Sequence, residues 1–151
     1  MTTNFQRTAN WLYACGKVPG HAGDISVQIG CHLEEIAEFI KCLRTDSEGG
    51  QLILDRTVVD LEWLAGKIKR GNYTAHIPNH LRSDALDAIC DTEVTGNGIA
   101  YLSSMNKDAA DQAVLAANDA KLVDGKPVFV EGTSKIGKPA GWKAADLSAF
   151  V

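Results

Sequence analysis

One stretch of the chain constrains its fold more than any other, because it combines helical apolar spacing with three glutamates. The stretch runs from Ile29 to Leu43 and places apolar side chains three and four residues apart, which predicts an amphipathic helix. Its apolar stripe comprises Leu33, Ile36, Ala37, Ile40 and Leu43. Glu34, Glu35 and Glu38 are predicted to lie on the opposite face, at spacings where like charges repel by about 0.2–0.5 kcal/mol.

Two explanations fit this acidic face. Water can solvate the glutamates, which is the more common meaning of a charged helix side. Alternatively, a hard divalent cation supplies the missing positive charge, since Mg²⁺ and Mn²⁺ prefer carboxylate oxygens. The stretch alone leaves both interpretations open.

Composition narrows the class of protein. A chain of 151 residues with 45% hydrophobic and 23% charged residues is expected to fold as one globular domain. Its formal net charge of −4 argues against a nucleic-acid-binding protein. No apolar run approaches the roughly 18 residues of a membrane span and no secretory signal is recognised, so we expect a cytoplasmic protein without a membrane partner. The four cysteines form no CxxC pair and are expected to be buried and reduced.

Four further helices are predicted, which makes the fold class all-α. Their ranges are Thr3–Cys15, Leu54–Arg70, Ser83–Met105 and Lys107–Ala120, with N-caps at Thr3, Ser83 and Asn106. In the first of these helices apolar residues repeat at helical spacing, at Phe5, Ala9 and Leu12. In the second, the predicted buried stripe is Val58, Leu61, Ala65 and Ile68. We expect a helical bundle over residues 1–120. Residues 121–151, rich in Gly, Pro and Lys, are expected to form an arm of the same domain, with a hairpin at Val128–Ile136.

A second acidic row lies on the predicted helix after residue 82. Asp84, Asp87 and Asp91 share one face of it. The helix dipole explains Asp84, but Asp91 lies two turns inside, where that effect has faded. Gly96 and Gly98 each cost about 1 kcal/mol in a helix interior, and close packing or room for a ligand is the usual reason for such glycines. Packed against the glutamates, the row would complete an oxygen-ligand site for Mg²⁺.

These motifs resemble those of the MazG-like all-α nucleoside triphosphate pyrophosphohydrolases, a family with EExxE followed by ExxD. LEEIAEF at residues 33–39 matches the first motif fully. In LDAICD at residues 86–91 the second motif is altered, because Ala88 stands three residues before Asp91. Asp84 and Asp87 offer an all-aspartate pair one turn earlier.

The resemblance is greatest for the phage-type branch and covers the chain from about Ile29 onward. There an acidic helix is followed by NxxK, here Asn118 and Lys121, and by the tail DGKP…GKPAGW…DLSAF at residues 124–150. The resemblance implies a MazG-like helical bundle that cleaves a nucleoside triphosphate to the monophosphate and pyrophosphate. It also implies a dimer or tetramer, in the host cytoplasm if the chain is phage-encoded.

By this resemblance, a metal-activated water attacks the α-phosphorus of the substrate. The implied ligands of Mg²⁺ or Mn²⁺ are Glu34, Glu35, Glu38, Asp87 and Asp91. The three glutamates are the implied catalytic residues, and Glu34 or Glu35 would orient or deprotonate the water.

The resemblance also suggests substrate-binding residues. Asn118 and Lys121 would face the phosphates, although Lys121 serves equally well as a cation at a helix C-terminus. The candidate base pocket consists of Asn10, Trp11, Gln28 and Asn97. Trp11 can instead pack against a neighbouring helix or subunit.

Several functions remain open on the sequence. A subgroup of the phage-type branch, the MazZ-like enzymes, converts (d)GTP to (d)GMP for 2-aminoadenine nucleotide supply, and other members of the family cleanse dCTP or dUTP from the nucleotide pool. Phosphoribosyl-ATP pyrophosphohydrolase shares the fold. From a different class, a non-catalytic helical regulatory or scaffold protein would need its acidic faces only for solvation.

Overall fold

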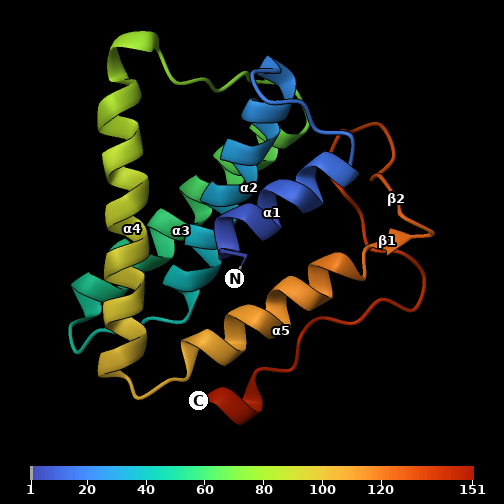
Figure 1. Ribbon diagram of the computed structural model, residues 1–151. Coiled ribbons are helices and arrows are strands. Elements are labelled where there is room, and N and C mark those ends of the chain that lie inside the picture. The colour runs from blue at the N-terminus through green and yellow to red at the C-terminus, as the bar shows by residue number, and fades with distance from the viewer. Residues whose placement is uncertain (1) are drawn as a thin grey trace. The chain divides into compact units, whose positions relative to one another are not determined.

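The computed structural model describes residues 2–151, and α-helices dominate that range (Figure 1). The helices are α1 (Asn4–Ala14), α2 (Ala22–Lys41), α3 (Glu48–Lys69), α4 (Arg82–Leu102) and α5 (Lys107–Asp119). Short 3₁₀ helices η1 (Asn79–Leu81) and η2 (Ser148–Phe150) and the strands β1 (Leu122–Val123) and β2 (Lys126–Pro127) complete the elements. The predicted all-α class is confirmed, because each strand has only two residues.

The chain divides into two units. One unit contains α1, α4, α5, the strands and the C-terminal residues 136–151. The other contains α2 and α3, within residues 18–76, together with the segment Phe129–Lys135. The segment predicted as an arm therefore contributes to both units. Its predicted role as part of a single domain stays a prediction.

Helices α2 and α3 both begin earlier than the sequence predicts. Their N-caps lie before glycines, which usually mark loops. The backbone N–H of Asp24 donates to Nδ1 of His21 at 3.2 Å, and this cap starts α2 at Ala22. Oγ of Ser47 accepts from the N–H of Gly50 at 2.9 Å and caps α3. Gly23, Gly49 and Gly50 thus belong to first helical turns rather than to loops.

Helices α2 and α3 form an antiparallel pair whose backbones approach closely at Gly30. A Cβ at this position would lie 2.9 Å from Cγ of Lys69, 3.1 Å from Cγ2 of Ile68 and 3.3 Å from the carbonyl oxygen of Ala65. Of the predicted buried stripe of α3, Val58, Ala65 and Ile68 are buried and Leu61 is half-buried. The absence of a side chain at Gly30 is what permits this contact.

In the other unit, α1 and α5 run in the same direction and are joined by polar contacts. Arg7 donates to Gln112 at 2.9 Å and to Asp119 at 2.6 Å. The indole N–H of Trp11 donates to the carbonyl of Asn118 at 2.8 Å. The apolar stripe of α1 is covered only in part, since Leu12 is half-buried whereas Ala9 is exposed and Phe5 is 81% exposed. Polar contacts therefore contribute much of the contact between α1 and α5.

The elements from η1 onward correct one prediction from the sequence and confirm two. Asn106 caps α5 as predicted, accepting from the N–H of Ala109 at 3.2 Å. Ser83 does not cap α4, because η1 runs directly into the helix at Leu81. A turn at Asp124–Gly125 joins β1 and β2, with φ of 50° and 73°. Both angles are positive, as a type I′ hairpin turn requires. The predicted hairpin at Val128–Ile136 also forms: the N–H of Val130 donates to the carbonyl of Lys135 at 2.9 Å, and the N–H of Gly137 donates to the carbonyl of Val128 at 2.6 Å.

All four cysteines are free, and only Cys15 is buried. Cys42 and Cys90 are exposed, so their predicted burial is wrong: the helices carry them on faces that no neighbour covers. Between residues 2 and 151, no helix combines the length and hydropathy that a membrane span requires.

The contact at Gly30 predicts a strong effect of a single methyl group. Gly30→Ala should lower the free energy of unfolding by about 1–3 kcal/mol, because the carbonyl of Ala65 is backbone and the stem of Lys69 is held by an ion pair. Gly96→Ala is the matched control: no atom lies within 4 Å of its added Cβ, and it should stabilise by about 0.5–1 kcal/mol. Urea unfolding followed by circular dichroism measures both. Equal effects of the two substitutions would contradict the close approach.

Candidate functional site

Glu34 has two lysine partners, one on each carboxylate oxygen. Nζ of Lys69, in the last turn of α3, forms an ion pair with Oε1 of Glu34. Nζ of Lys135 lies 3.0 Å from Oε2. The side chain of Glu34 is 30% exposed and that of Lys69 only 13%. The prediction that Glu34 lies on the face opposite the packing is therefore wrong, since α3 supplies one of its partners.

These contacts shift the pKa values of both ends of the Lys135–Glu34 pair. Partial burial disfavours the charged form of each group, but the lysine contacts outweigh it for Glu34 and hold its pKa below the ordinary 4.5. Burial likewise opposes the charge of Lys135, while the carboxylate of Glu34 raises the pKa of this lysine above 10.5. Both groups are thus charged across the whole neutral range.

The other two glutamates of α2 differ from Glu34 in their surroundings. Glu35 and Glu38 are exposed side chains. Within residues 2–151, no three His, Cys, Asp or Glu side chains gather closely enough to hold a metal ion. Asp87 and Asp91 lie on α4, in the other unit, and both are exposed. The predicted metal site stays a prediction.

A cavity of about 510 Å³ adjoins the lysine-bound carboxylate. It is bounded by α2, α3 and the segment Phe129–Lys135, all within one unit. Three basic side chains line it: Lys69, Arg70 and Lys135. Its acidic lining consists of Glu34, Glu62 and Glu131. Charged groups of both signs facing one cavity favour a charged polar ligand over an apolar one.

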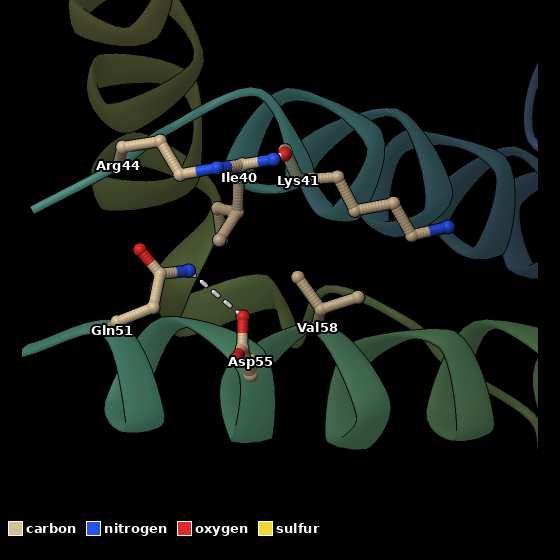
Figure 2. A pocket seen from close by; sticks show the side chains of 6 residues that line it. All are labelled: Ile40, Lys41, Arg44, Gln51, Asp55 and Val58. Carbon is tan, nitrogen blue, oxygen red and sulfur yellow. Dashed lines mark hydrogen bonds between the residues drawn. The ribbon is translucent and has the colours of Figure 1, made fainter. Parts of the chain in front are cut away.

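Figure 2 shows a second cavity of the same unit, of about 510 Å³, where α2 ends and α3 begins. Its polar groups have partners within the chain. Arg44 donates to the carbonyls of Lys41 at 2.8 Å and Leu43 at 2.6 Å, closing the end of α2. Gln51 donates to Asp55 at 2.9 Å, and Lys41 is paired with Glu62. Because each group already has a partner, we assign no ligand to this cavity.

A cluster of aromatic rings and lysines forms at the end of α5. Nζ of Lys121 lies 5.9 Å from the ring centroid of Trp11 and 5.3 Å from that of Trp142. It also donates to Oδ1 of Asn118 at 2.8 Å. The indole N–H of Trp142 donates to the carbonyl of Ala117 at 2.7 Å. Trp142 thus provides a donor for a carbonyl in the last turn of α5. Trp11 adds a second donor to the carbonyl of Asn118, which also accepts from the N–H of Lys121 at 3.0 Å.

The structure brings together some of the predicted binding residues and separates others. Trp11 and the NxxK pair meet in the cluster just described, where packing against a helix, one of the two predicted roles of Trp11, is realised. Gln28 lies in the other unit, on α2. Asn10 and Asn97 are exposed, and in the described part of the chain their side chains make no hydrogen bond.

Three residues with important contacts are missed by sequence reasoning. From the sequence, Lys69 is explained as a cation that compensates the dipole of α3. Nothing in the sequence indicates that its side chain reaches Glu34. Lys135 lies 101 positions from Glu34 in the chain, so no local spacing connects them. Trp142 stands in the GKPAGW motif of the tail, which is the one signal that could have singled it out.

Comparisons with protein-family models, curated proteins and solved structures found no match for this chain.

The ion pairs of Glu34 predict a defined pH dependence of stability. Because the folded-state pKa of Glu34 is depressed, its stabilisation is fully present above the ordinary pKa of 4.5 and is lost as the pH falls through the lower folded-state value. Glu34→Gln should therefore cost about 1 kcal/mol at pH 7 and progressively less below pH 4.5.

The raised pKa of Lys135 sets the upper pH limit of this stabilisation. The contribution of the charged Lys135 is fully present below pH 10.5 and is lost as the pH rises through its folded-state pKa. Glu38→Gln, on an exposed side chain of the same helix, is the control and should leave the stability profile close to that of the wild type. Thermal unfolding from pH 3 to pH 11 tests the pair. A constant difference between wild type and Glu34→Gln across that range would contradict it.

Proposed function

We propose that the chain is a metal-dependent nucleoside triphosphate pyrophosphohydrolase of MazG-like type, which cleaves a (d)NTP to the (d)NMP and pyrophosphate. The observation that carries the proposal is the position of Glu34: the first glutamate of the EExxE motif lies at a charged cavity, between Lys69 and Lys135. The helical fold agrees with the family that the motifs resemble. Among substrates we favour (d)GTP, with 2-aminoadenine nucleotide supply as the role, and dCTP or dUTP cleansing as the alternative.

The chain's own residues contribute charge and position to this proposed reaction. In the family that the motifs resemble, Mg²⁺ or Mn²⁺ supplies charge neutralisation at phosphorus and an activated water. The chain itself offers exposed carboxylates at Glu35 and Glu38, and lysines beside Glu34 that can neutralise phosphate charge. Asn118 and Lys121 remain proposed phosphate contacts. The packing of Lys121 between two tryptophans supports a structural role at least as well.

A homo-oligomer is part of the proposal. Helix α4 exposes large apolar side chains on several faces, including Leu86 at 63%, Val94 at 66% and Leu102 at 83%. Exposed apolar surface of this extent favours association. A dimer or tetramer in the cytoplasm is the assembly that the resemblance implies.

Turnover of a nucleotide panel tests the proposed function. With Mg²⁺ or Mn²⁺ present, we expect pyrophosphate release from (d)GTP, and a loss of at least about 100-fold in Glu38→Gln, as is usual when a group that acts in the reaction is removed. Glu48→Gln, at the start of α3, is a charge-matched control that should retain activity. The measurement is a coupled pyrophosphate assay on (d)GTP, dCTP, dUTP and phosphoribosyl-ATP.

Each outcome distinguishes the candidate functions. Turnover of dCTP or dUTP alone would keep the enzyme class and replace the proposed role. Turnover of phosphoribosyl-ATP alone would assign the chain to that related activity. No release from any substrate, with a melting temperature indifferent to Mg²⁺ and Mn²⁺, would leave a regulatory or scaffold protein.

A further inference from the structure

The cavity beside Glu34 holds more positive charge than its neighbouring carboxylates neutralise. Glu62, one of its acids, is already paired with Lys41, which is not part of the lining. The cations of Lys69, Arg70 and Lys135 then face only Glu34 and Glu131. The ammonium groups of Lys69 and Lys135 both contact the single carboxylate of Glu34, so the excess positive charge is concentrated there.

Arg70 adds a third cation with a free hydrogen-bonding fork. Its guanidinium lies over Gly66: a Cβ at Gly66 would be 3.1 Å from Nη2 and 3.2 Å from Nη1. Within residues 2–151, this guanidinium makes no hydrogen bond or ion pair. A helix-interior glycine costs about 1 kcal/mol, and Gly66 leaves the space that the guanidinium occupies at the cavity.

We propose that this cavity binds the phosphate groups of a nucleotide through Lys69, Arg70 and Lys135, and that Glu34 is the internal counter-ion which the phosphate displaces. A guanidinium binds two phosphate oxygens with its fork, while lysines act as mobile point charges. A polyphosphate carries more negative charge than one carboxylate and therefore competes with Glu34 for both ammonium groups. The nucleotide as the source of the phosphate rests on the proposed function, but the binding of the phosphate group does not.

Binding at this place also involves the tail of the chain. Lys135 lies at the end of the segment Phe129–Lys135, whose backbone is closed by the bond from the N–H of Val130 to the carbonyl of Lys135, at 2.9 Å. A phosphate held by Lys135 therefore fixes this segment against α2 and α3. The segment becomes part of the binding site rather than a connection between elements.

Inorganic pyrophosphate without metal is the probe that separates this inference from catalysis. We would titrate it into the full-length protein by isothermal calorimetry, in low salt and excess EDTA. Lys69→Gln, Arg70→Gln and Lys135→Gln should each weaken binding about tenfold or more, as expected for the loss of a charged hydrogen bond. Lys135→Arg, which keeps the charge, should stay within about threefold of the wild type. Lys67→Gln is the matched control, because Lys67 also lies in the last turn of α3 but stacks on Trp63 outside the cavity.

The decisive variant is Glu34→Gln. The proposed phosphate site predicts a gain in pyrophosphate affinity for this variant, whereas the proposed enzyme predicts a loss of turnover. Removing the counter-ion frees both lysines, so pyrophosphate should bind about threefold to tenfold more tightly, while turnover is lost. Weaker or unchanged binding in Glu34→Gln would overturn the inference, as would wild-type binding that Lys67→Gln weakens equally. Orthophosphate and dGMP in the same titration show whether one phosphate group suffices. Circular dichroism of each variant excludes loss of folding as the cause.

The two proposals can fail separately. Pyrophosphate binding with the predicted order of variants, but no turnover of any nucleotide, would support the phosphate site and overturn the enzyme. Turnover that does not change in Lys69→Gln and Lys135→Gln would support the enzyme and overturn the phosphate site.

Discussion

The close approach of α2 to α3 at Gly30 is the constraint on which the charged cavity depends. Because Gly30 has no side chain, the stem of Lys69 lies directly against α2. Its ammonium reaches the carboxylate of Glu34, which lies one turn after Gly30 on α2. A larger residue at Gly30 would move α3 outward and lengthen this ion pair. The charged site and the helix packing therefore depend on each other, because Gly30 sets the distance between α2 and α3 that the side chain of Lys69 spans to reach Glu34.

The sequence predicts the elements well where local chemistry decides, and poorly where distant residues do. Apolar spacing locates α3, and Thr3 and Asn106 are recognised as caps. The starts of α2 and α3 are missed because histidine is a rare cap and glycines usually mark loops. Periodicity also assigns Glu34 to the solvent side. The apolar spacing of α2 shows which face is apolar. It does not show that a neighbouring helix places a lysine at the edge of that face.

Lysines at helix ends have an additional meaning in this fold. Lys69 and Lys121 both stand where the helix dipole favours a cation, and on the sequence that explanation is sufficient for either. The structure gives each a specific partner set: a carboxylate for Lys69, and two indole rings with an amide for Lys121. The dipole explains why a lysine is tolerated at these positions, whereas the partners explain why its side chain has a fixed direction.

The distribution of the two units along the chain has a consequence for synthesis. Helices α2 and α3 are contiguous within residues 18–76 and can pack as soon as they leave the ribosome. Helix α1, made first, has its partner α5 only after residue 119 has been added. Glu34 accordingly acquires Lys69 early and Lys135 late. The nascent chain thus passes through a stage in which one lysine neutralises the carboxylate, and translation of the tail adds the second lysine and with it the net positive charge of the finished protein.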